Sequence, residues 1–350
     1  MLNTDIKNSP DMRLLLLENW LSQYQAKWSI QLETLVPASS DASFRRYFRL
    51  NTSNPLHQSL IVMDAPPERE KIEPFIRIAH LFLKAGLQVP HILEEDLAQG
   101  FILLSDLGNR TYLAELNKKT ASGLYQDASN ALIQLQLASK PSTLPHYDSN
   151  LFQREMDLFP EWYLKQHLRI ALSELERSEL QKIFDLLIQN HLAETQVYVH
   201  RDFHSRNLMM LEKNNPGILD FQDAVYGPLS YDLVSLWRDA YIVWTESEVL
   251  DWLISYWEKA RKAGIKVPND FGDFYKDFEW MGLQRHLKIL GIFARLYHRD
   301  GKEAYLQDLP TVLKYALDVA NRYRDFKVLA KLLERSQAML QAALPKSDRS

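Results

Sequence analysis

Cysteine is absent from the 350-residue sequence. Its absence excludes disulfide bonds and catalysis by a thiol. Long hydrophobic runs are also missing, because no stretch approaches the ~18 consecutive apolar residues that a membrane-spanning helix needs. The N-terminus lacks the basic region and apolar core that are typical of a signal peptide. These absences predict a cytoplasmic protein without a membrane partner.

An excess of charge of one sign is missing as well. The formal net charge is −4, which gives no support for binding to nucleic acids or anionic membranes. Hydrophobic residues make up 46% of the chain and charged residues 25%, which is ordinary for a globular protein. At roughly 150 residues per domain, the length predicts two domains or lobes.

The most informative part of the chain is a set of polar residues that follow two short apolar runs, at residues 197–199 and 217–219. His200 and Asp202 follow the first run, Asn207 stands five positions after Asp202, and Asp220 comes directly after the second run. Turn-forming residues separate the runs, a pattern typical of strand, loop and strand. We therefore expect Asp202, Asn207 and Asp220 to converge at one end of a small hairpin.

These three side chains have the chemistry of ATP-dependent phosphoryl transfer. Negative charge spreads over the transferred phosphoryl oxygens in the transition state, so a divalent cation is needed to neutralise it. Mg²⁺ prefers hard oxygen ligands, and Asn207 and Asp220 supply them. Asp202 is then the expected catalytic residue, which orients the acceptor hydroxyl and takes its proton.

Two other interpretations of this pattern remain open. Asp and Asn at this spacing also occur in ordinary turns, and His200 and His204 have the i,i+4 spacing of zinc ligands on a helix. The apolar run before His200 favours a strand, however, and the glutamate of an HExxH motif is absent. We therefore favour a buried His200 that braces the loop, and we expect Asp232 to hydrogen-bond back to the same loop.

The sequence HRDFHSRNLM, followed by GILDFQDAVYGPLSYDLVSL, resembles the catalytic and metal loops of the protein-kinase-like superfamily, in its aminoglycoside phosphotransferase branch. The resemblance covers about residues 10–340. Only eleven residues lie between Asp220 and Asp232, which is too short for the activation loop and peptide-docking surface of a protein kinase. A small acceptor is therefore favoured.

Within that branch, the chain is similar to the kinases that phosphorylate N-acetylmuramate and N-acetylglucosamine at the C1 hydroxyl in bacterial cell-wall recycling. This narrower resemblance is carried by the segments SDASFRRYFRL, SLIVMDAPPE, LFPEWYL and QRHLKILGIFARLYHRDGKEAYL.

The resemblance implies an α+β, bilobal protein-kinase-like fold. It places a small lobe with an antiparallel sheet, which binds the nucleotide, at residues 1–104, and a hinge at residues 105–108. A larger, mainly helical lobe for catalysis and acceptor binding is expected at residues 109–343. Residues 344–350 are expected to form a disordered tail.

The expected nucleotide-binding lobe departs from the family pattern at two places. The turn at residues 37–43, which would cover the ATP phosphates, contains no glycine to permit a close approach. The strand at residues 59–65 lacks the lysine that kinases place there to pair with the α- and β-phosphates. Positive charge for the phosphates must then come from elsewhere.

We expect an arginine of the neighbouring strand to supply this charge, from Arg45, Arg46 and Arg49, with Arg46 preferred. The alternative is that these arginines only form a solvated face of the strand. The resemblance implies the following set of nucleotide-binding residues: Ser43, Phe44, Arg46, Met63, Leu104 and Asp106.

Acceptor-binding residues are expected in the second lobe. The segment 152–168 offers Glu155 and Trp162 for contacts with a sugar, and the helix expected at 279–297 offers Arg285 for an anionic substituent. Both segments also have a plainer interpretation, the first as helix core and the second as a solvated basic face. The acceptor-binding set is Glu155, Trp162, His204, Arg206, Asp223 and Arg285.

Together these features predict an enzyme, a phosphotransferase with an alcohol group as acceptor. The resemblance implies ATP as co-substrate, Mg²⁺ as cofactor, and the C1 hydroxyl of N-acetylmuramate, N-acetylglucosamine or both as acceptor. We expect a monomer with a small-molecule sugar substrate. Two alternatives remain open: a phosphotransferase of aminoglycosides or other small molecules, and a nucleotide-binding pseudokinase scaffold. The missing lysine and glycines favour the scaffold, and the complete set of Asp202, Asn207 and Asp220 disfavours it.

Overall fold

The computed structural model describes residues 11–39 and 44–343, and the chain divides into two compact units. Unit 1 comprises Met1–Asn109 and Leu211–Asp223, and unit 2 comprises Arg110–Met210 and Ala224–Ser350. The chain first leaves unit 1 directly after the predicted hinge. Its return at Leu211–Asp223 was not expected, since the sequence analysis placed this segment in the second lobe. The predicted tail at residues 344–350 lies outside the described residues.

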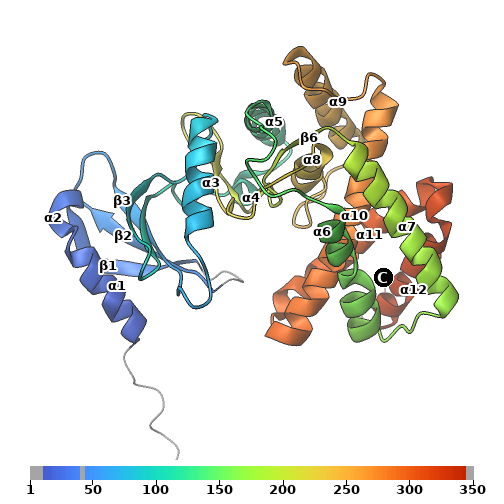
Figure 1. The fold of residues 1–350 in the computed structure, drawn as a ribbon, viewed down its shortest axis with the longest axis horizontal. Helices are drawn as coiled ribbons and strands as arrows, with labels where there is room; N and C mark the ends of the chain where they lie inside the picture. Colours follow the sequence, from blue (N-terminus) through green and yellow to red (C-terminus); the bar gives the residue numbers. More distant parts are fainter. Residues whose placement is uncertain (1–10, 40–43, 344–350) are drawn as a thin grey trace, which may run out of the picture. The chain divides into compact units, whose positions relative to one another are not determined.

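Unit 1 is built around an antiparallel sheet of five strands in the order β1-β2-β3-β5-β4 (Figure 1). Phe48, Val62 and Leu103 lie opposite one another on neighbouring strands and therefore share one face of the sheet. The small antiparallel sheet predicted for the first lobe is confirmed. The strands are β1 (Ile30–Ser39), β2 (Arg46–Thr52), β3 (Ser59–Asp64), β4 (Ile92–Asp96) and β5 (Phe101–Ser105).

Helix α1 (Met12–Ser22) covers this face of the sheet. Its N-cap residue, Asp11, accepts hydrogen bonds from two backbone N–H groups of the first turn, which have no partner inside the helix. Leu17 and Trp20 of α1 join the strand residues in one buried apolar cluster. The short helix α2 (Gln25–Trp28) leads from α1 into β1.

Helix α3 (Glu73–Lys84) lies on the other side of the strands (Figure 1). Phe221 packs against Phe75 and Phe82 of this helix, with ring centroids 4.8 and 5.8 Å apart. Aromatic contacts of this kind bury a large apolar area. They explain why the segment that contains Phe221 belongs to unit 1.

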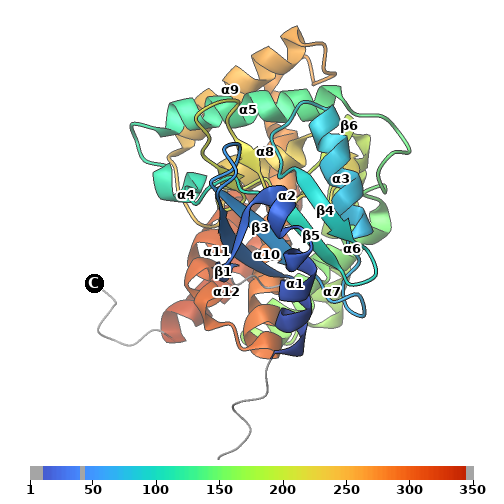
Figure 2. The same cartoon turned by 90° about the vertical axis from the view of Figure 1, so that its left-hand side faces the viewer.

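Unit 2 is mainly helical, as predicted (Figure 2). Helix α10 contacts α6, η1, α7, α8 and α11. Strands β6 and β9 form an antiparallel pair. None of the described helices is long and apolar enough to cross a membrane. The helices are α4 (Tyr112–Glu115), α5 (Ala121–Leu137), α6 (Ser149–Met156), η1 (Phe159–His167), α7 (Glu174–Ala193), α8 (Ser230–Trp237), α9 (Glu246–Lys262), α10 (Phe271–Asp300), η2 (Glu303–Asp308), α11 (Leu309–Arg322), η3 (Arg324–Phe326) and α12 (Lys327–Ala343), and the strands are β6 (Gln196–Val199), β7 (Leu208–Met209) and β9 (Val225–Pro228).

Helix α10 approaches η1 so closely that one position has no room for a side chain. A Cβ at Gly291 would lie 2.4 Å from the carbonyl carbon and 2.5 Å from the carbonyl oxygen of Leu158, the residue before η1. At Gly282 on the same helix, a Cβ would meet its nearest neighbours at 3.8 Å, an ordinary contact. The packing of α10 against η1 therefore depends on the glycine at position 291.

We predict that Gly291→Ala destabilises the protein and that Gly282→Ala does not. The added methyl group at position 291 forces two backbones apart, and overpacking of this kind costs about 1–3 kcal/mol. At position 282 the better helix propensity of alanine stabilises by up to about 1 kcal/mol. Urea unfolding measures both free energies against the wild type. Two variants of equal stability would contradict the close approach of α10 and η1.

Candidate active site

The loop that follows β6 is fastened to α8. The carboxylate of Asp232 accepts hydrogen bonds from the backbone N–H of His200 at 2.6 Å and of Arg201 at 3.0 Å. Arg201 has a φ of +76°, in the left-handed region that residues with a side chain rarely adopt. The two hydrogen bonds hold the loop in this conformation, so the predicted bracing role of Asp232 is confirmed.

His200 is fully buried beneath this loop. Its Nδ1 accepts a hydrogen bond from the N–H of Asp202 at 3.2 Å, and its ring lies edge-on to Phe203 with 5.6 Å between centroids. His200 therefore supports the backbone of its own loop. This is the role that the sequence analysis favoured over a zinc ligand.

Asn207 closes the loop that begins at Asp202. Its Nδ2 donates to the carbonyl oxygen of Asp202 at 3.0 Å, and its backbone N–H donates to the carbonyl oxygen of His204 at 2.9 Å. The amide nitrogen is thus turned toward the loop backbone, and the amide oxygen, the atom suited to Mg²⁺, points in a different direction. The loop brings the predicted catalytic residue and one predicted metal ligand together within unit 2.

The Asp202 carboxylate lies among cations. Nη2 of Arg285 is 3.7 Å from its Oδ1. The Asp202 side chain is 40% exposed. Its partial burial would raise the pKa of Asp202, but the charges of Arg285 and Lys288 outweigh this and lower the pKa below the ordinary value. Asp202 is therefore ionised at neutral pH and able to accept a hydrogen bond from a hydroxyl group.

A buried cluster of charges adjoins Asp202. Glu155 is 6% exposed, and its Oε1 lies 2.6 Å from Nη2 of Arg201 and 3.0 Å from Nζ of Lys288. The Tyr147 hydroxyl donates to its other carboxylate oxygen. Burial would raise the pKa of Glu155, but Lys288 and Arg201 lower it. Both carboxylate oxygens of Glu155 thus have protein partners.

The basic part of α10 is buried, so its interpretation as a solvated face is wrong. Arg285 is 5% exposed and Lys288 is 7% exposed. Arg285 donates to the carbonyl oxygen of Arg201 at 2.9 Å, and both Arg285 and Lys288 donate to the Tyr231 hydroxyl, at 3.1 and 2.9 Å. From this basic helix the sequence analysis chose Arg285 as the site residue and not Lys288. Its position three residues after Arg285, on the same face of a helix, is the signal that could have identified it.

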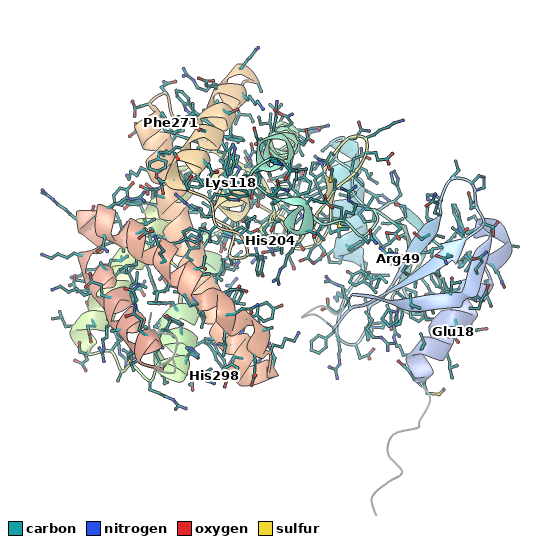
Figure 3. The ribbon with its side chains drawn as sticks, turned by 180° about the vertical axis from the view of Figure 1, so that it is seen from behind. Glu18, Arg49, Lys118, His204, Phe271 and His298 are labelled. Carbon is teal, nitrogen blue, oxygen red and sulfur yellow. The ribbon has the colours of Figure 1, made fainter. Side chains whose placement is uncertain are left out.

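His204 and Arg206 both contact Tyr241. The His204 ring (labelled in Figure 3) lies edge-on to Tyr241 with 5.5 Å between centroids, and the Arg206 guanidinium lies 3.5 Å from the centre of the same ring. Between them, the N–H and the hydroxyl of Ser205 donate to Asp239. The direct acceptor contacts proposed from the sequence stay predictions for Glu155, Trp162, His204, Arg206, Asp223 and Arg285.

Asp220 follows strand β8 (Gly217–Ile218) in unit 1. It has a φ of +60°, and Nε2 of Gln222 donates to its Oδ1 at 2.7 Å. Strand β8 bridges to Gln88, and Phe221 packs on α3, so Asp220 is anchored within unit 1 on both sides. The other two members of the predicted trio belong to unit 2. Their convergence with Asp220 therefore stays a prediction.

Two predicted nucleotide-binding residues form ion pairs within the sheet of unit 1. Nη2 of Arg46 lies 2.5 Å from Oδ2 of the buried Asp64. Asp106 accepts hydrogen bonds from Arg49 (labelled in Figure 3) at 2.6 and 3.0 Å and from Ser59 at 2.7 Å. Burial would raise the pKa of Asp106, and the bonds from Arg49 and Ser59 lower it. Contacts of Arg46 and Asp106 with a nucleotide stay predictions.

The remaining predicted nucleotide-binding residues differ in exposure. Met63 is fully buried and Leu104 is 2% exposed, and both belong to paired strands of the sheet. Phe44 is 56% exposed, and the Arg69 guanidinium lies 4.7 Å from the centre of its ring. Ser43 lies outside the described residues. Nucleotide contacts of these residues stay predictions as well.

We predict that the contribution of Asp232 to stability falls as the pH rises. Burial raises the pKa of Asp232 to about 7, whereas an aspartate in an unfolded chain titrates near ~3.9. Between these values the native state keeps a proton that the unfolded state has lost. The contribution is therefore full below about pH 4 and is lost as the pH rises through about 7.

Asp232→Asn cannot titrate, so it should reduce the loss of unfolding free energy between about pH 5 and about pH 8. Urea unfolding at both pH values measures this difference. Asp251→Asn, an exposed aspartate on α9, is the matched control and should keep the pH dependence of the wild type. An Asp232→Asn variant whose stability falls as steeply as that of the wild type would show that burial does not raise this pKa.

Comparison with known proteins gives a consistent result. The model of the phosphotransferase enzyme family matches residues 34–265. A protein of Pseudomonas putida named N-acetylmuramate/N-acetylglucosamine kinase is 43% identical over 335 residues, which cover 94% of this chain and 98% of that protein. A protein of Neisseria meningitidis serogroup B with the same name is 46% identical over 325 residues, which cover 92% of this chain and 95% of that protein.

Two solved structures share the fold at much lower identity. The ADP-bound aminoglycoside phosphotransferase APH(2'')-Ib matches with a TM-score of 0.56 and 17% identity, over 86% of this chain and 98% of that chain. The choline kinase LicA from Streptococcus pneumoniae matches with a TM-score of 0.62 and 11% identity, over 87% of this chain and 99% of that chain. The predicted α+β, protein-kinase-like fold is confirmed. Because the family model spans more than half of the chain and the relatives span nearly all of it, the chain belongs to the phosphotransferase enzyme family.

Proposed function

We propose that this phosphotransferase is an ATP- and Mg²⁺-dependent sugar kinase that acts on the C1 hydroxyl of N-acetylmuramate, N-acetylglucosamine or both. The observation that carries the proposal is the loop from Asp202 to Asn207, whose aspartate is kept ionised by buried cations. Relatives that are 43% and 46% identical to the chain are named as kinases of these sugars. Such an acceptor fits a role in peptidoglycan recycling, carried out in the cytoplasm by a monomer without nucleic-acid or membrane partners.

In the proposed reaction, Asp202 orients the acceptor hydroxyl and accepts its proton. The hydroxyl oxygen forms a bond to the γ-phosphorus, the bond between this phosphorus and the β,γ-bridging oxygen breaks, and ADP leaves with the electron pair. Because its pKa is lowered, Asp202 is a weak base. Its main contribution is to hold the hydroxyl in line with the phosphorus.

Asn207 and Asp220 fit a Mg²⁺ ion. Asn207 offers an amide oxygen and Asp220 a carboxylate, which are the hard oxygen ligands that Mg²⁺ prefers. The Asn207 amide nitrogen donates to the loop backbone, so the amide oxygen is turned away from that carbonyl group. When bound, Mg²⁺ neutralises the charge that develops on the phosphoryl oxygens.

The charges around Asp202 favour a neutral or anionic acceptor over a cationic one. Arg201, Arg285 and Lys288 bring three positive charges to the carboxylates of Asp202 and Glu155. The nearby Asp232 is only partly ionised at neutral pH, because burial raises its pKa to about 7. The remaining positive charge would repel a polycationic aminoglycoside. It would attract the lactyl carboxylate of N-acetylmuramate. This imbalance supports the sugar kinase over the antibiotic phosphotransferase.

We predict that the protein releases ADP from ATP and Mg²⁺ with the two N-acetyl amino sugars as acceptors, and not with kanamycin or choline. NMR of the product locates the phosphate, which we expect on C1. Asp202→Asn should lower turnover by about 10²-fold or more while ATP still binds, because the hydroxyl loses its charged acceptor. Asp251→Asn is the matched control. Turnover of kanamycin or choline alone would contradict the proposal, and an Asp202→Asn variant with the wild-type rate would remove Asp202 from the mechanism.

We predict that Lys288→Met moves the acid limb of the kcat/KM profile to higher pH. Lys288 helps to lower the pKa of Asp202, so its removal raises this pKa, and the carboxylate becomes protonated at a higher pH than in the wild type. Lys276→Met, a half-buried lysine on the same helix, is the matched control and should leave the profile unchanged. An acid limb that does not move in Lys288→Met would show that Asp202 does not depend on Lys288.

A further inference from the structure

Strand β3 of unit 1 offers no positive charge to a nucleotide. Its last two residues are Met63 and Asp64, and both side chains are fully buried. Three arginines, Arg45, Arg46 and Arg49, lie in or directly before the neighbouring strand β2. Their contacts distinguish the three.

Arg46 is directed to the α1 face of the sheet. It shares this face with Phe48, which stands two residues later in the strand. The Arg46 guanidinium lies 5.5 Å from the centre of the Phe48 ring. It binds Asp64 and also Asp11, the N-cap residue of α1. Arg49 binds Asp106 through two hydrogen bonds. Both arginines therefore connect parts of unit 1 that do not include Asp220.

Arg45 is placed differently. Its Nη2 lies 2.8 Å from Oε2 of Glu70, and the side chains of the two residues are only 11% and 18% exposed. Burial works to lower the pKa of Arg45, but the charges of neighbouring groups, among them Glu70, Asp220 and Asp223, raise it. Asp220 and Asp223 are therefore close enough to act on the Arg45 charge. The carboxylates that act most strongly on the charges of Arg46 and Arg49 are their own ion-pair partners, Asp11, Asp64 and Asp106.

The groups around Arg45 are fixed to one another within unit 1. Glu70 ends a turn in which its backbone N–H donates to the carbonyl oxygen of Pro66 at 2.9 Å. Arg69, in the same turn, stacks on Phe44, the residue before Arg45. Phe221, the residue after Asp220, packs on α3, which begins three residues after Glu70. Arg45, which is held by Glu70, thus lies in the same compact unit as Asp220, the predicted metal ligand.

We propose that Arg45 binds the phosphates of ATP and that Glu70 positions its guanidinium, in place of the lysine that β3 lacks. This proposal rests on the proposed use of ATP. A guanidinium carries N–H donors on all three of its nitrogens, and its planar fork matches two phosphate oxygens. Arg45 would neutralise phosphate charge on the same unit that supplies Asp220 to Mg²⁺, and Glu70 would keep the guanidinium from collapsing onto Asp220.

The test compares ligands that differ only in their phosphates. Isothermal titration calorimetry of the full chain measures the dissociation constants of three ligands: ATP with Mg²⁺, ADP with Mg²⁺, and adenosine. For Arg45→Met we expect ATP and ADP to bind about 10- to 100-fold more weakly, as is typical for the loss of hydrogen bonds to a charged group, and adenosine to bind as in the wild type. Unchanged adenosine binding also shows that the variant is folded. Arg77→Met, an exposed arginine on α3, is the matched control and should bind all three ligands normally.

Glu70 is a positioning residue, so its variants should show a graded effect. Glu70→Gln removes the charge and keeps the shape, and we expect weaker binding of ATP with unchanged binding of adenosine. Glu70→Asp keeps the charge and should restore part of the loss. Arg45→Lys, which keeps the charge without the planar fork, should lie between Arg45→Met and the wild type.

The possible outcomes distinguish a failure of the proposed use of ATP from a failure of the proposed role of Arg45. A wild-type protein that binds adenosine no less tightly than ATP with Mg²⁺ would contradict the proposed function itself. A wild type that prefers ATP, together with an Arg45→Met variant that keeps this preference, would refute the role of Arg45 alone. Equal weakening of ATP, ADP and adenosine would make Arg45 a structural residue. A phosphate-selective loss in Arg46→Met and not in Arg45→Met would give the role to Arg46.

Discussion

Asp232 accepts hydrogen bonds from the backbone N–H groups of His200 and Arg201, and the site in unit 2 depends on this pair of bonds. It keeps Arg201 in a left-handed conformation that a residue with a side chain adopts only when its surroundings enforce it. In that conformation the Arg201 guanidinium reaches Glu155 and its carbonyl oxygen accepts a hydrogen bond from Arg285. Asp202 is the next residue of the chain. The buried carboxylate of α8 therefore sets both the direction of the loop and the charges that surround Asp202, the proposed catalytic residue.

Both units hold cations by pairing them with buried or half-buried acids. In unit 2, Glu155 binds Arg201 and Lys288, and the charges of Arg285 and Lys288 keep Asp202 ionised. In unit 1, Glu70 holds Arg45. A buried ion pair of this kind contributes little net stability, because desolvation offsets the attraction. Its value here is the fixed position of a charge, and a reaction that moves a highly charged phosphoryl group needs charges in fixed positions.

The sequence predicted the local elements of unit 1 well and their partners poorly. The strand expected at residues 59–65 corresponds to β3, and the neighbouring strand expected to carry the arginines corresponds to β2, because alternating apolar residues and turn signals are local properties. The return of Leu211–Asp223 to unit 1 was not predicted. It depends on Phe221 meeting two phenylalanines of α3, which lie far away in the chain. No local sequence pattern predicts a contact between residues so far apart in the chain.

By itself, the sequence determined which residue types stand in the proposed catalytic loop. Asp202, Asn207 and the bracing His200 stand where a strand-loop motif and phosphoryl-transfer chemistry would use an aspartate, an asparagine and a histidine. Only the tertiary structure determined which acidic and basic side chains lie next to one another. A basic helix has the same periodicity whether it faces water or a buried acid, so only the position of Glu155 shows that Lys288 belongs to the site. The reason is physical: electrostatic partners are chosen by distance in space, and distance in space is settled only when the chain has folded.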